Sequence, residues 1–180
     1  MRIYTLGYEG LGIRAYADIL LSFNVGVVLD VRDHAWSMNA AFIKANFERH
    51  LAMIGIRYVH VRSAGNPPEI RKTAKSAAEC MTRYREHLSH NSECIGELYS
   101  YARLAFESGR PACLTCMEHL PQNCHRSVLV DALTTEDRRI EPVHLPLDAP
   151  IESRRRGSDL PSARRLFANS FLNPTLLPSK

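Results

Sequence analysis

The sequence predicts an α/β domain, in which helices cover both faces of a mostly parallel sheet of about five strands (a Rossmann-like three-layer sandwich). Segments of strand and helix character alternate along the chain, an order that produces parallel strands joined by right-handed crossovers. Two strand segments, residues 26–32 and 112–117, are short apolar runs of the kind that parallel sheets bury on both faces. The 180 residues, 45% of them hydrophobic, suffice for one full hydrophobic core.

In the N-terminal third of the chain, the sequence predicts three strands and two helices. Residues 2–8 are apolar and β-rich, as expected of a first strand. Residues 11–23 should form a helix, because apolar side chains recur at helical spacing at Tyr16, Ile19, Leu20 and Phe23. After the strand at 26–32, Asn39 is a suitable N-cap, and the second helix ends at Gly55. Its apolar face consists of Ile43, Phe47, Leu51 and Ile54. Residues 56–61 alternate like a third strand.

The remainder of the domain predicts a loop, three helices and two strands. Residues 62–73 hold a glycine and two prolines and are predicted to be a mobile loop. The apolar period then gives helices over 77–88 and 95–105. The fourth strand, 112–117, leads through a loop to an amphipathic helix that begins near Cys124. Residues 141–146 are expected to be the fifth strand.

Composition limits the classes of protein that fit. No apolar run reaches the ~20 residues that span a bilayer, and no apolar segment of a signal peptide follows the N-terminus. We therefore expect a cytoplasmic protein without a membrane partner, whose five cysteines are reduced thiols. The net charge of +4 weakly favours an anionic partner.

The chain is expected to divide at residue 147. Residues 1–147 form the single α/β domain, and residues 148–180 form a C-terminal extension that is both basic and apolar. Its charges include Arg154, Arg155, Arg156, Arg164 and Arg165. Because its leucines and phenylalanines are too numerous for a free tail, we expect it to pack on the body or on a second subunit, as in a homodimer.

Polar and reactive side chains gather where three predicted strands end. Ligands of open α/β sheets bind beyond the carboxyl ends of the strands, so these side chains define the expected site. Its catalytic group is expected to be Cys116, Glu118, Cys124 and His125. Its substrate-binding group is expected to be Tyr8, Asp30, Arg32 and Arg126.

Cys124 should lie in the first turn of its helix. There the helix dipole, helped by His125 and Arg126, is expected to depress a thiol pKa, so that Cys124 or Cys116 is an activated thiolate. The same helix end, with Arg126 and Arg32, would hold a phosphate-like group. The structural alternative is a buried thiol, with Arg126 paired to Asp30.

The acidic and aromatic side chains near the expected site are also expected to have specific roles. Glu118, beside an apolar loop, is expected to have a raised pKa and to serve as general acid or base, or else to orient Arg126 or His125. Asp30 is expected to orient Arg126 or His125 as well. Tyr8 and Trp36 lie near the rim, where a ring could stack on a base, although packing beneath its loop is the favoured place for Trp36.

Three functions fit these residues. The leading one is a thiol-dependent enzyme acting on an anionic small molecule or nucleotide, of unspecified reaction type and cofactor. The second is a nucleic-acid-binding module that takes a modified base into the pocket. The third is a small metal-binding protein. Because Cys113 and Cys116 are three apart on a strand and point to opposite faces, Cys113 belongs to the core, and the metal ligands would be Cys116, Cys124 and His125.

Four motifs occur together in order along the chain. They are Thr5-Leu-Gly-Tyr-Glu9, Leu29-Asp-Val-Arg32, Gly55-Ile-Arg-Tyr-Val-His60 with Gly65-Asn-Pro67, and Cys116-x-Glu118 followed by Cys124-His-Arg126. Over residues 1–147 the chain resembles the bacterial and archaeal family called domain of unknown function 488. It departs from the family at Ala35, where a proline is common, and at Ala64-Gly-Asn-Pro67, where Leu-Gly-Gly-Pro is common. The resemblance implies a compact α/β domain with a pocket formed by the eight site residues, and it implies no substrate.

Overall fold

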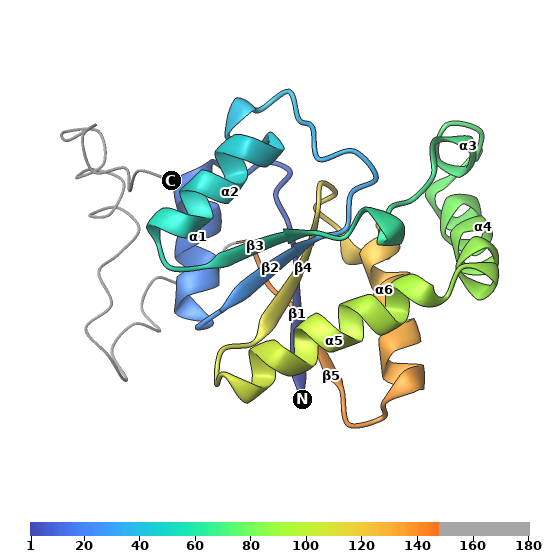
Figure 1. The fold of residues 1–180 in the computed structure, drawn as a ribbon. Helices are drawn as coiled ribbons and strands as arrows, with labels where there is room; N and C mark the ends of the chain where they lie inside the picture. Colours follow the sequence, from blue (N-terminus) through green and yellow to red (C-terminus); the bar gives the residue numbers. More distant parts are fainter. Residues whose placement is uncertain (148–180) are drawn as a thin grey trace.

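The computed structural model describes residues 1–147, which contain a five-stranded sheet with the order β3-β2-β4-β1-β5 (Figure 1). The strands are β1 (Arg2–Gly7), β2 (Val27–Asp30), β3 (Arg57–His60), β4 (Ala112–Cys116) and β5 (Glu141–His144). All four strand pairings are parallel. The predicted α/β class and the positions of the five strands are therefore confirmed.

Burial follows the position of each strand in the sheet. β4 is the central strand, and every residue of β4 and of its neighbour β2 is buried. The edge strand β5, in contrast, has three exposed residues of four. The continuous apolar runs of the sequence thus mark the strands covered on both faces.

Helices cover both faces of the sheet and form two hydrophobic clusters (Figure 1). One face is covered by α1 (Ile13–Ser22), the 3₁₀ helix η1 (Ala40–Phe42) and α2 (Lys44–Met53). The other is covered by α4 (Ala77–His90), α5 (Glu93–Glu107) and α6 (His125–Glu136). No helix of the described residues is long and apolar enough to cross a membrane.

The alternation of side chains along β4 separates two of the cysteines, as predicted. Cys113 is fully buried in the cluster beneath α1 and α2, and burial raises the pKa of its thiol to about 12. Cys116 lies in the opposite cluster, on the side of α6. Cys113 is a core residue, and Cys116 is available to the site at the end of the strand.

Two segments differ from the sequence prediction. Residues 62–73, predicted to be a mobile loop, contain two short helices, the 3₁₀ helix η2 (Arg62–Ala64) and α3 (Pro68–Arg71). Asn39 is an N-cap as predicted, but it caps η1, where its Oδ1 accepts a hydrogen bond from the backbone of Ala41. α2 begins separately at Lys44. The expected extension, residues 148–180, lies outside the described residues.

Candidate functional site

A cavity of about 600 Å³ opens at the carboxyl ends of the three inner strands. Its wall includes Tyr8 after β1, Arg32 after β2, and Cys116 and Glu118 at the end of β4. His125, the first residue of α6, completes this side of the cavity. The ends of three strands and the start of α6 therefore bring five of the eight expected site residues to one cavity.

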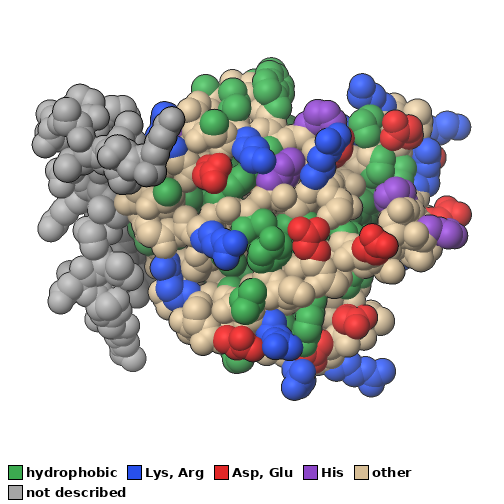
Figure 2. Space-filling view, in the orientation of Figure 1, with side chains coloured by type: hydrophobic (Ala, Val, Ile, Leu, Met, Phe, Trp, Pro, Cys, Tyr) green, Lys and Arg blue, Asp and Glu red, His purple; other side chains and the backbone are tan. Residues whose placement is uncertain are grey.

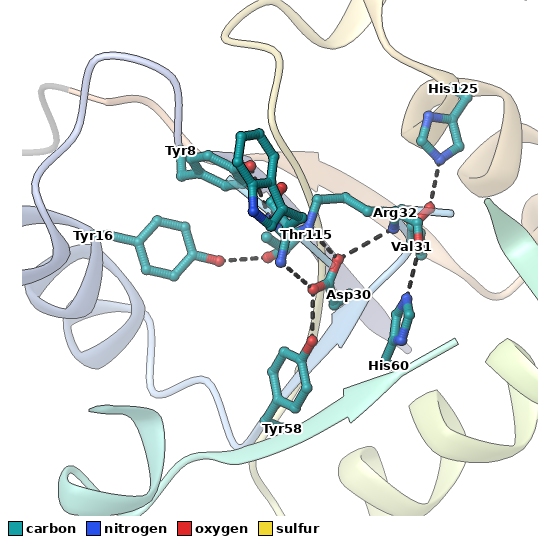
Figure 3. A network of polar contacts seen from close by, with 10 residues as sticks. Tyr8, Tyr16, Asp30, Val31, Arg32, Tyr58, His60, Thr115 and His125 are labelled. Carbon is teal, nitrogen blue, oxygen red and sulfur yellow. Dashed lines mark hydrogen bonds and ion pairs between the residues drawn. The ribbon is translucent and has the colours of Figure 1, made fainter. Parts of the chain in front are cut away.

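Asp30 and Arg32 form a buried ion pair beneath the cavity (Figure 3). Arg32 donates from Nε to Oδ1 at 2.8 Å and from Nη2 to Oδ2 at 2.5 Å. Asp30 also accepts hydrogen bonds from the Arg32 backbone N–H and from the Tyr58 hydroxyl, at 3.1 Å and 2.7 Å. The expectation that Asp30 orients Arg126 or His125 is therefore wrong, since its partners are Arg32 and Tyr58.

The Tyr8 ring joins this ion pair to the cavity wall. Its hydroxyl accepts a hydrogen bond from Arg32 Nη1 at 2.9 Å, and the ring stacks on Phe42 with the centroids 4.2 Å apart. The Arg32 side chain is held on three sides, because Nη1 also contacts the carbonyl oxygen of Trp36 at 3.4 Å. Tyr8 and Arg32 are thus fixed before any ligand enters.

Cys116, Cys124 and His125 bring two sulfurs and a ring nitrogen together. The three atoms, Sγ, Sγ and Nδ1, all lie within 4.8 Å of one another. Each sulfur is 3.9 Å from Nδ1. The other ring nitrogen, Nε2, lies 2.7 Å from the carbonyl oxygen of Val31 and donates to it (Figure 3). A neutral His125 therefore presents an unprotonated Nδ1 to both sulfurs.

Glu118 lies beside this cluster on the cavity wall. The Cys116 thiol donates to its Oε2 at 3.0 Å. Burial alone would raise the pKa of Glu118, but hydrogen bonds from the Cys116 and Cys124 thiols outweigh burial, and the pKa lies below its ordinary value. The expectation of a raised pKa is wrong, because the apolar surroundings come together with donors to the carboxylate.

Cys124 lies at the expected position, at the start of α6, but its thiol does not have the expected low pKa. It is the N-cap of α6, and its side chain is 1% exposed. Burial and the neighbouring Cys116 raise the pKa of the Cys124 thiol well above its ordinary value, despite the opposing effect of His125. Burial exceeds any effect of the helix dipole, so the predicted depression is wrong. Of the two cysteines, Cys116 lines the cavity and Cys124 does not.

Arg126 supports the loop after β4 rather than the cavity wall. It is 2% exposed and donates to the carbonyl oxygens of Glu118 and His119 at 2.5 Å and 2.9 Å. It is paired neither with Asp30 nor with any of the other described carboxylates. Gly7 lets the same loop approach β1, since a Cβ on Gly7 would stand only 1.9 Å from the Glu118 oxygen.

Several cavity residues escaped the sequence analysis. Arg71 and Lys72 bring exposed cationic side chains to the cavity from the end of α3. Asn66 is 4% exposed there, and its Oδ1 has no hydrogen-bond partner among the described residues. Trp36 also lines the cavity and is 64% exposed, so the expected packing beneath its loop is wrong. The motif around Gly65-Asn-Pro67 was the signal that could have pointed to this wall.

The chain was compared with families and with individual proteins. No curated protein and no solved structure matches it at a significant level of similarity. The family model described as domain of unknown function DUF488 matches residues 12–133, more than half of the chain. The matched range includes seven of the eight expected site residues, and the eighth, Tyr8, lies just before it. The chain belongs to the DUF488 family.

Proposed function

We propose that the cavity is the active site of a thiol-dependent enzyme that acts on an anionic small molecule or nucleotide. One observation carries the proposal: Cys116, Glu118 and His125 share a cavity of about 600 Å³ with the cationic side chains of Arg71 and Lys72. The volume suits a small molecule. Sulfur, carboxylate and imidazole are groups that perform chemistry, and the cations supply a means of binding a negative charge.

The reacting groups have separable tasks. Cys116 lines the cavity and would supply the reacting sulfur, which lies 3.9 Å from His125 Nδ1. Glu118 reaches the same wall and would serve as the base that takes a proton from substrate or water. Val31 fixes the imidazole through the Nε2 hydrogen bond, so the ring cannot rotate away from the sulfur.

The anion would be held mainly by Arg71 and Lys72. The Arg32 charge is largely compensated by the buried carboxylate of Asp30, whereas these two side chains are exposed. Arg71 uses one donor, Nε, on the carbonyl oxygen of Asn66 at 3.4 Å, which leaves its Nη groups for a ligand. The unpartnered Oδ1 of Asn66 would accept a hydrogen bond from the same ligand.

Mass spectrometry of a panel of phosphorylated metabolites, carboxylates and nucleotides, incubated with the purified protein, tests the proposal. We expect at least one compound to be converted by the wild-type chain and by Cys94→Ser, a control that changes a buried thiol outside the described cavity wall. Cys116→Ala should bind the compound but leave it unchanged. Equal conversion by Cys116→Ala and the wild type would contradict the proposal.

The second candidate, a nucleic-acid-binding module, is favoured by Trp36, because an exposed indole that lines the same cavity as two cations can stack on a base. An extended contact with the phosphate backbone is disfavoured, because acidic and basic side chains are interspersed on the face shown in Figure 2. Measuring the affinity for nucleic acid at increasing salt concentration tests this candidate. Phosphate contacts give an affinity that falls steeply with salt, and a flat response to salt would remove this candidate.

A further inference from the structure

We propose that Cys116, Cys124 and His125 bind a thiophilic divalent metal ion, Zn²⁺, with one coordination position facing the cavity. This inference goes beyond the proposed function and does not depend on turnover. Zn²⁺ favours four ligands in a tetrahedron, at about 2.3 Å from sulfur and about 2.0 Å from nitrogen. That geometry separates sulfur and nitrogen by about 3.6 Å. Both sulfurs are 3.9 Å from Nδ1, a few tenths of an ångström above that separation. The two sulfurs lie within 4.8 Å of each other, so closure around an ion also requires them to come to about 3.8 Å apart.

The hydrogen bond behind His125 is the second observation. Histidine ligands of metals commonly donate their other ring N–H to a carbonyl or carboxylate, which fixes the tautomer and the direction of the lone pair. His125 does this through Nε2, 2.7 Å from the Val31 oxygen (Figure 3). This leaves Nδ1 unprotonated, with its lone pair 3.9 Å from each of the two sulfurs.

Charge also suits this ion. Each S–H bond is replaced by an S–Zn bond, the two protons leave to solvent, and no group is oxidised or reduced. The two negative charges of the thiolates, with a neutral imidazole, balance the charge of Zn²⁺, so residues that are 1–5% exposed gain no net charge. All five cysteines are free thiols in the structure, which leaves both sulfurs available as ligands.

The fourth coordination position would face the cavity, because two of the three protein ligands line it. Cys116 and His125 line it, whereas Cys124 is not among the described residues of its wall. Three protein ligands with a position left for water or substrate are the arrangement of catalytic rather than structural zinc. The Cys116 thiol donates a hydrogen bond to Glu118 Oε2 at 3.0 Å. Once that proton has left, Glu118 can accept one from water or substrate at the open position. The thiol dependence of the proposed enzyme then arises from ligation.

Metal titration of the full chain tests the inference. The protein is stripped with a chelator under reducing conditions, and Zn²⁺ is added in competition with a chromophoric chelator. We expect one ion per chain. Cys116→Ser, Cys124→Ser and His125→Asn should each weaken binding by more than about 100-fold, because outer-shell partners alone are worth about 10- to 100-fold. Cys80→Ser, which alters a thiol on the same cavity wall, should leave the affinity unchanged.

A measurement on the wild-type chain guards against variants that fail to fold. Co²⁺ in the stripped protein should give the thiolate-to-cobalt charge-transfer band and the intense visible bands of tetrahedral coordination. Absence of binding, a weak octahedral spectrum, or an equal loss in Cys80→Ser would overturn the site, as would a Cys116–Cys124 disulfide that persists under reduction. Turnover by protein that binds no metal would overturn this inference alone. Metal binding without turnover of any compound would overturn only the proposed function.

Discussion

The carboxylate of Asp30 and the guanidinium of Arg32, two residues apart, lie face to face in a two-point ion pair under the cavity. Asp30 is fully buried, and Arg32 is 5% exposed. Removing one charge of such a pair leaves the other buried without compensation, which costs about 3–5 kcal/mol. We therefore expect Asp30→Asn to lower the free energy of unfolding by about 3 kcal/mol, measured by urea denaturation.

Tyr58→Phe provides the matched control for that variant. It removes one hydrogen bond to Asp30 and leaves the ion pair intact, so the expected loss is about 1 kcal/mol. Equal losses in the two variants would show that the charge of Asp30 contributes little beyond its hydrogen bonds.

Gly7 sets the position of the loop that carries Glu118. A Cβ there would stand 1.9 Å from the Glu118 carbonyl oxygen and 3.0 Å from Arg126 Nη1. Gly7→Ala should therefore cost about 2 kcal/mol or more, because backbone must move. Gly96→Ala in α5 meets no atom within 4 Å, and helix propensity predicts a gain of about 0.5–1 kcal/mol. Thermal unfolding of both variants checks the difference, and a Gly7→Ala protein as stable as the wild type would refute this account of the loop.

The pattern of apolar residues was sufficient to predict the sheet. The strands β2 and β4, which lie within the two apolar runs, are buried throughout, and strand alternation places Cys113 and Cys116 on opposite faces, as predicted. The site could be located for a similar reason, since parallel strands end at one edge and bring Tyr8, Arg32 and Cys116 to the same cavity.

Properties set by three-dimensional surroundings were harder to predict. Local sequence favoured a low thiol pKa at the start of α6, but the burial of Cys124 depends on packing between α4, α6 and the sheet. The partner of Asp30 was missed although Arg32 is two residues away, because strand spacing shows a shared face and not a closed ion pair. Arg71 and Lys72 reach the cavity from α3, a helix of four residues whose apolar period is too short to recognise.

His50 should make stability depend on pH. Burial, with a smaller effect of the Arg49 charge, lowers the pKa of His50 below its ordinary value of 6.5. The folded state then binds fewer protons than the unfolded state, so this contribution to stability is present above pH 6.5 and is lost as the pH falls below it. The free energy of unfolding, measured by urea denaturation between pH 7.5 and 5.5, should fall less steeply with decreasing pH in His50→Gln than in the wild type. His90→Gln, at an exposed position in α4, should keep the wild-type slope.

Arg71 and Lys72 should bind the anion without supporting the fold. Both are exposed, so Arg71→Gln combined with Lys72→Gln should change the free energy of unfolding by less than about 0.5 kcal/mol. Each lost charge at a partly solvated site is worth up to about 1 kcal/mol, so AMP or inorganic phosphate should bind about 10-fold more weakly to the double variant. Calorimetric titration at low salt measures the effect, which should shrink as salt screens the charges. Lys75→Gln changes an exposed lysine beyond the cavity wall and should bind like the wild type. If Lys75→Gln weakens binding as much as the double variant does, the attraction comes from the net charge of the chain and not from the cavity.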